Sequence, residues 1–180
     1  MRDIGAREEK KKECASGAAE PAGITLRPVH SGDEPFVFRL FTASRPDLEW
    51  ITGISEDIKD SLVSQQYRYE QEQMLKEHPE GDFCIILLGG EPVGRLYVYC
   101  GIKILRIMAI SLLPEYRGRG IGGKLLAGIL KEAAGAGKQV RLQVAWYNSY
   151  ARAFYEKLGF VVVEDAGVYC EMQWTPLSIG

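Results

Sequence analysis

A strand, a loop rich in glycine and arginine, and an amphipathic helix follow one another in this chain, and together they constrain its fold most. Residues 107–113 form an apolar run that predicts a buried strand, and Pro114 ends it. The helix after the loop repeats apolar side chains at three- and four-residue steps, so they share one face. These side chains are Ile121, Leu125, Leu126, Ile129, Leu130 and Ala133. The pattern predicts an α/β fold in which this helix packs on a sheet.

Residues 117–124, which join the strand to the helix and form its first turn, are named the glycine loop. The first N–H groups of a helix have no carbonyl partner inside it, and the helix dipole adds partial positive charge there. Glycines let phosphate oxygens approach the backbone, and Arg117 and Arg119 add charge. The sequence therefore predicts that the glycine loop binds a phosphorylated ligand, mainly through backbone N–H groups.

Two nucleotide-binding patterns fit the glycine loop only in part. Three of its glycines have the spacing of the dinucleotide fingerprint, which also needs an acid about 20 residues further on. The next predicted strand, residues 140–146, contains no carboxylate. Lys124 completes most of a phosphate-binding P-loop, but Leu125 stands where Ser or Thr must hold magnesium. A nucleotide-binding oxidoreductase domain is therefore the weaker alternative.

A third pattern, Arg117-x-x-Gly120-x-Gly122, resembles the coenzyme A pyrophosphate loop of the GNAT acetyltransferase superfamily. The residues that lead into the loop, Asn148 after the next strand, and residues 153–160 resemble that family in the same order. The resemblance covers residues 24 to about 174. It implies an α/β acyl-CoA N-acyltransferase fold, a mixed sheet of about seven strands with about four helices on its faces.

The resemblance also implies an activity, that of an acetyl-CoA-dependent N-acetyltransferase. Such a transferase moves an acetyl group to a primary amine of a small molecule or peptide, by direct attack in a ternary complex. Acetyl-CoA is the implied co-substrate, and no metal is implied. The implied coenzyme A-binding residues are Ile110, Leu112, Arg117, Gly118, Arg119, Gly120, Ile121, Gly122, Gly123, Lys124, Asn148 and Tyr155. Ile110 and Leu112 would contribute backbone atoms.

Two of these residues have a structural alternative. Tyr155 resembles the family tyrosine that protonates the departing thiolate, which makes it the expected catalytic residue. It also shares an apolar helix face with Phe154 and Leu158, so packing is its other role. Asn148 resembles the residue that hydrogen-bonds the pantetheine arm, and it is equally suited to cap the helix that begins at Ser149.

The family often takes the proton of the attacking amine with an acid in the central strand. Residues 102–113 contain no acid. We therefore expect a water relay, or an acid from elsewhere such as Glu49, Asp82 or Asp165. The missing acid also leaves open a second alternative, a coenzyme A-binding regulatory module without catalysis.

The sequence constrains the identity of the acetyl acceptor less than that of the cofactor. Arg95, Tyr97 and Tyr99 alternate with apolar residues and so share one face of a strand. Aromatic rings with arginines suit a small amine that carries a carboxylate. The structural alternative is that the tyrosines simply cover the sheet.

Length and composition fit one domain. The chain has 180 residues and a net charge of -2, which gives no reason to expect nucleic acid or an anionic membrane as a partner. No apolar run approaches the roughly 20 residues that span a bilayer. The four cysteines have no metal-site spacing, and we expect reduced thiols and a cytoplasmic location. The sequence is compatible with a homodimer.

The expected domain covers residues 24–175, after a mobile leader of residues 1–23 with a helical turn near residues 7–13. The expected strands are residues 24–27, 83–88, 92–100, 102–113, 140–146, 160–163 and 168–174. The expected helices are residues 34–43 with Asp33 as N-cap, 55–77, the helix of the glycine loop, and 149–158. In the second helix, Ile58, Leu62 and Tyr69 are predicted to form the buried face.

Overall fold

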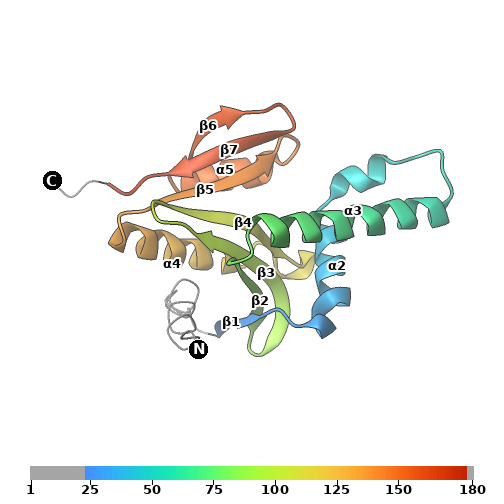
Figure 1. Cartoon of the computed structure of the whole chain (residues 1–180), viewed down its shortest axis with the longest axis horizontal. Helices are drawn as coiled ribbons and strands as arrows, with labels where there is room; N and C mark the ends of the chain where they lie inside the picture. Colours follow the sequence, from blue (N-terminus) through green and yellow to red (C-terminus); the bar gives the residue numbers. More distant parts are fainter. Residues whose placement is uncertain (1–22, 178–180) are drawn as a thin grey trace, which may run out of the picture.

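The computed structural model describes residues 23–177, which form a mixed seven-stranded sheet with helices on both faces (Figure 1). The sheet order is β1-β2-β3-β4-β5-β7-β6. The strands are β1 (Ile24–Pro28), β2 (Asp82–Leu88), β3 (Glu91–Cys100), β4 (Ile104–Leu112), β5 (Gln139–Ala145), β6 (Val161–Asp165) and β7 (Tyr169–Trp174). The helices are α2 (Glu34–Ala43), α3 (Glu56–Glu77), α4 (Ile121–Gly135) and α5 (Ser149–Lys157). The predicted α/β architecture is confirmed.

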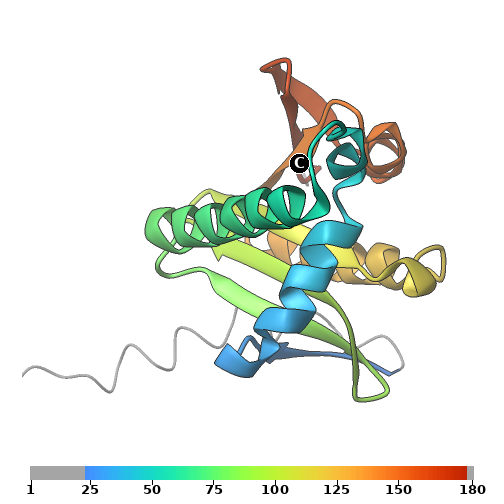
Figure 2. The ribbon, with the colours of Figure 1, turned by 90° about the vertical axis from the view of Figure 1, so that its right-hand side faces the viewer.

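Two apolar layers cover the two faces of the sheet. In Figure 2, α2 and α3 cross in front of the sheet and α4 lies on the far side. The layer under α2 and α3 contains Val37, Phe41, Val63, Tyr67 and Ile85. The layer on the opposite face is larger and is built by α4, α5 and the inward side chains of the strands.

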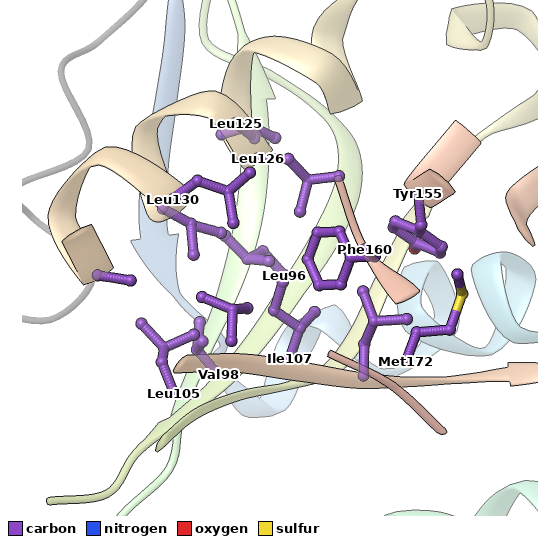
Figure 3. Packing of buried hydrophobic residues seen from close by; sticks show 14 of the residues in the cluster. Leu96, Val98, Leu105, Ile107, Leu125, Leu126, Leu130, Tyr155, Phe160 and Met172 are labelled. Atoms are coloured by element: carbon purple, nitrogen blue, oxygen red, sulfur yellow. The ribbon is translucent and has the colours of Figure 1, made fainter. Parts of the chain in front are cut away.

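The predicted apolar face of α4 is confirmed, because all six of its side chains are buried. Figure 3 shows Leu125, Leu126 and Leu130 against side chains of β3 and β4. Burying a leucine side chain stabilises a fold by about 1.5–3 kcal/mol. This packing holds the start of α4, and with it the glycine loop, at the end of β4.

The predicted buried face of α3 is wrong. Ile58, Leu62 and Tyr69 are exposed, whereas Val63 and Tyr67 are buried. The helix is 22 residues long and buries only these two side chains, one turn apart, in the layer under α2 and α3. Elsewhere along the helix Met74 is half-buried, whereas Ile58, Leu62, Tyr69 and Leu75 are exposed.

The start of the central strand and the capping role of Asp33 also differ from the prediction. The central strand begins at Ile104 rather than at residue 102, because Gly101 donates its N–H to the carbonyl of Ile104 (2.9 Å) and closes a turn. Asp33 occupies the N-cap position of α2, but its carboxylate does not cap the helix. Instead it accepts two hydrogen bonds of 2.7 Å from Arg27.

The cysteines divide into two groups. Cys84 and Cys170 carry free, buried thiols, and burial raises the pKa of Cys84 to about 11. Cys100 is disulfide-bonded. The expectation of reduced thiols is therefore wrong at Cys100, which is half-buried at the end of β3. This bond weakens the sequence argument for a cytoplasmic location.

Residues 1–22, and with them most of the predicted leader and its helical turn, lie outside the described residues. No helix within residues 23–177 is long and apolar enough to cross a membrane. The same residues contain no cluster of His, Cys, Asp and Glu side chains arranged to hold a metal ion.

Candidate functional site: a fork between two strands

β4 and β5 run together for only part of their length. They pair in parallel from Ile104 to Ile107, after which β4 continues to Leu112 without a partner on that side. The cause is a β-bulge. Val98 pairs with Ile107 and Tyr97 with Ala109, so Met108 is an extra residue on β4. A bulge bends the strand that carries it, and here it opens a fork between β4 and β5.

Three contiguous clefts run through the fork. The central cleft, of about 190 Å³, lies between the two strands. It shares Ile110, Ser111 and Tyr155 with a large cleft of about 890 Å³ that extends towards α2 and the glycine loop. It shares Met108 and Gln143 with a distal cleft of about 510 Å³ beneath α3. The central cleft therefore connects the large cleft with the distal cleft through shared lining residues.

The glycine loop borders the large cleft and has the backbone geometry of an anion site. Gly118 and Gly120 have φ angles of 71° and 78°, the left-handed region that favours glycine. Gly120 is the N-cap of α4, and its carbonyl accepts the N–H of Lys124 (3.0 Å). The earlier N–H groups of the first turn have no carbonyl within the helix. Apart from each glycine's neighbours in the chain, no atom of the described residues lies within 4 Å of where a Cβ on either glycine would stand, which leaves open space for a phosphate.

The cationic side chains of the glycine loop have different environments. Arg117 donates to the carbonyl of Leu112 (2.9 Å) and to that of Ala43 (2.8 Å), which ties the loop to the ends of β4 and α2. Arg119 is exposed, with its guanidinium 5.3 Å from the ring centre of Tyr116. Lys124 is also exposed. Arg119 and Lys124 are therefore free to reach an anion, whereas Arg117 positions the loop.

Tyr155 lies at the junction of the large and central clefts. Its ring is 8% exposed and contacts Phe154 and Phe160 at 5.5 and 5.6 Å between ring centres. Within the described residues its hydroxyl makes no hydrogen bond, so it is available to a ligand in the clefts. Burial raises the pKa of Tyr155 to about 12. The hydroxyl is therefore protonated at neutral pH and can act as a donor.

Asn148 fulfils the structural role expected for it and also borders the clefts. Its side-chain oxygen accepts the N–H of Ala151 (3.1 Å) and so caps α5. The neighbouring Tyr147 donates its hydroxyl to Asp47 (2.9 Å). Burial and the hydrogen bond to Asp47 raise the pKa of Tyr147 to about 12. Arg45 in turn binds Asp47 and Glu70. No sequence pattern linked these residues, which fix the wall of the large cleft.

No carboxylate of the described residues lines the central cleft, whereas Glu70 and Glu77 line the distal cleft. Of the acids expected to serve as a base, Glu49 lines the large cleft, whereas Asp82 and Asp165 line none of the three clefts. Asp60, at the start of α3, also lines the large cleft and was missed by the sequence argument. Asp47 already binds Arg45 and Tyr147, which lower its pKa despite partial burial.

The structure brings the sequence-predicted site residues together around the large cleft. Six of them line it: Ile110, Leu112, Arg117, Gly122, Asn148 and Tyr155. The other six lie in the adjoining glycine loop: Gly118, Arg119, Gly120, Ile121, Gly123 and Lys124. Among these, Ile121 buries its side chain in the core, so only its backbone can meet a ligand.

Comparison with known proteins identifies the family of this chain. Residues 47–160 match the Acetyltransferase (GNAT) family. The chain belongs to this family. A mycothiol acetyltransferase from Corynebacterium glutamicum is 34% identical over 105 residues, which cover 57% of this chain and 36% of that protein. The chain thus spans little more than a third of that relative's length.

Two solved acetyltransferase structures have the same fold. The PaiA N-acetyltransferase of Thermoplasma acidophilum, in complex with coenzyme A, is 21% identical with a TM-score of 0.62. It covers 84% of this chain, which covers 98% of it. Arabidopsis thaliana Naa50, in complex with the bisubstrate analogue CoA-Ac-MVNAL, is 18% identical with a TM-score of 0.56. The match covers 86% of this chain and 99% of the Naa50 chain. The implied GNAT acyltransferase fold is confirmed.

Proposed function

We propose that the chain is an acetyl-CoA-dependent N-acetyltransferase that acetylates a primary amine of a small molecule or peptide by direct attack in a ternary complex. The observation that carries this proposal is the fork, which joins the bare glycine loop to the Tyr155 hydroxyl through contiguous clefts. Family membership supports it, as do the coenzyme A complex of PaiA and the bisubstrate complex of Naa50.

In this proposal the glycine loop binds the pyrophosphate of coenzyme A. Backbone N–H groups of residues 119–124 contact its oxygens, and Arg119 and Lys124 add charge. The arm of the cofactor then enters the fork beside the unpaired edge of β4, as an added strand does at a sheet edge. Because Arg117 already occupies the Leu112 carbonyl, Ile110 is the better-placed backbone partner for the arm.

Tyr155 serves the leaving sulfur in this proposal. A thiol has a pKa of about 8.5, whereas that of Tyr155 is raised to about 12. The thiolate is therefore the weaker base, and the hydroxyl stabilises the departing charge by donating a hydrogen bond. Full protonation of the sulfur is left to solvent.

The amine must lose a proton to attack, and β4 offers no carboxylate to take it. Glu49 is the expected acid that lines the large cleft, and it is exposed. We propose that the proton leaves through water, with Glu49 as its acceptor at the rim. A cytoplasmic location and a homodimer stay predictions.

The acid-free β4 also favours the regulatory alternative, a module that binds coenzyme A without catalysis. Thiol release from acetyl-CoA across a panel of small amines and peptides separates the two, with the amine-free reaction as control. We expect release that depends on one class of amine. Acetyl-CoA binding without release for any amine would support the regulatory module instead.

A further inference from the structure

Arg95 is a buried cation, and no carboxylate of the residues that the structure describes pairs with it. It lies on β3, is 6% exposed, and lines the central cleft. Its Nε donates to the hydroxyl of Ser111, the residue paired with it on β4 (3.2 Å), and its guanidinium lies 5.2 Å from the ring centre of Tyr97. Its Nη1 is buried and has no hydrogen-bond partner within the described residues.

The other arginines of the described strands all have carboxylate partners. Arg27 pairs with Asp33 at 2.7 Å. Arg106 and Arg141 both pair with Glu171, at 3.1 and 3.3 Å. Arg95 is more deeply buried than any of them and has no such pair. Burying a charge that faces no opposite charge is unfavourable. The position of Arg95 therefore favours an anion that enters the central cleft.

The size and position of the central cleft restrict what that anion can be. The cleft measures about 190 Å³ and also contains Tyr155 in its lining. An anion bound to Arg95 would therefore lie in the same small space as the proposed reaction centre. A bulky phosphorylated group would exceed this space, whereas a carboxylate a few bonds from an amine would fit it.

We propose that Arg95 and the Ser111 hydroxyl bind the carboxylate of the acceptor, so that the substrate is a small molecule carrying both an amine and a carboxylate. The proposal rests on the acetyltransferase function above. A planar guanidinium binds a carboxylate through two parallel hydrogen bonds, and the orphaned Nη1 supplies one of these donors. The acceptor then enters from the distal cleft, and its amine points to the fork.

Matched pairs of α-amino acids and their amides test the proposal, with acetyl-CoA as the donor. The amide keeps the shape of the acid and loses its charge. Its amine also loses a proton more readily, so a preference for the acid cannot come from a more available nucleophile. We expect kcat/KM to favour the acid by about ten- to a hundredfold, the range of a hydrogen bond to a charged group.

Arg95→Met should remove this preference, because the acid loses the cation that binds its carboxylate. Arg141→Met is the control, because Arg141 lies two strands away on β5, lines none of the clefts and pairs with Glu171. It should keep the preference. If Arg95→Met fails to fold, Arg95→Lys, which keeps the charge without the planar fork, should reduce the preference in part.

A binding measurement makes the result independent of turnover. With saturating coenzyme A, an amino acid should raise the melting temperature of the wild type and of Arg141→Met, but not that of Arg95→Met. Equal effects of acid and amide, no effect of any acid, or an acid effect that survives in Arg95→Met would each overturn the inference. Amine-dependent thiol release without a preference for the acid would overturn the carboxylate inference and leave the proposed acetyltransferase function standing. Failure to bind acetyl-CoA would overturn the proposed function itself.

Discussion

At the scale of single residues, the Tyr155 hydroxyl separates a catalytic role from a packing role. Tyr155→Phe keeps the ring against Phe154 and Phe160 and removes only the donor. We expect kcat to fall about tenfold to a hundredfold, the range for losing a hydrogen bond to a charged group, with acetyl-CoA binding little changed. Steady-state kinetics and a melting curve measure both effects. A lower melting temperature with unchanged kcat per folded molecule would show that Tyr155 only packs.

A second residue-scale prediction concerns stability in acid. Hydrogen bonds from Arg27 lower the pKa of Asp33 to about 2. The pair therefore stabilises the fold above the unfolded pKa of about 3.9, and this stabilisation is lost as pH falls towards 2. Asp33→Asn should lower the free energy of unfolding by about 1 kcal/mol near pH 7, since solvent partly screens the pair.

Urea unfolding near pH 7 and near pH 2 measures this loss. The difference between wild type and Asp33→Asn should be mostly lost at the lower pH. Glu91→Gln serves as the control, because Glu91 is exposed and makes no ion pair within the described residues. A deficit of Asp33→Asn that persists unchanged at pH 2 would contradict the ion-pair explanation.

The sequence predicted the site residues that belong to local motifs. It missed those whose role depends on contacts between segments far apart in the chain. Tyr155 and Asn148 belong to a local motif, and both border the clefts as expected. The sequence placed Arg95 on the correct face of its strand. It could not show that Arg95 lacks a carboxylate partner, because that depends on which strands flank β3. The bond between Tyr147 and Asp47 joins residues 100 positions apart, and no local pattern indicates such a contact.

At the scale of elements, the glycine loop gives a test of backbone geometry. Gly120→Asp places a carboxylate at the N-cap where phosphate is expected, on a backbone with a φ of 78°. We expect acetyl-CoA binding to be lost, as measured by calorimetric titration. Gly137→Asp is the matched control, because Gly137 also has a positive φ of 65° and open space around it, at the far end of α4. Gly137→Asp should show similar backbone strain and retain acetyl-CoA binding. Equal acetyl-CoA binding by the wild type and Gly120→Asp would show that the glycine loop is not the phosphate-binding site.

Most elements were predictable because their apolar periodicity is set locally, as the six buried side chains of α4 illustrate. The exposed side chains of α3 show the limit of periodicity, since a long helix buries only the turn that meets the sheet. The fork was not predictable from the strand sequence. The bulge at Met108 appears only in the pairing of β3 with β4, where Tyr97 meets Ala109.

At the scale of the whole molecule, segments far apart in the chain converge on one cleft. The end of α2, the start of α4, the start of α5 and the free part of β4 all line it. Figure 1 shows these elements gathered beside the diverging ends of β4 and β5. The site therefore depends on the folded sheet, and a ligand that bridges these segments should stabilise the whole fold.

The central claim is that the glycine loop and the fork together bind acetyl-CoA. The melting temperature of the wild type, measured with acetyl-CoA and with pantetheine that lacks phosphate, tests it most directly. Acetyl-CoA at about 100 times its dissociation constant should stabilise the fold by roughly 2.7 kcal/mol, and pantetheine at the same concentration by much less. A melting temperature unmoved by millimolar acetyl-CoA, or moved equally by both compounds, would contradict the claim.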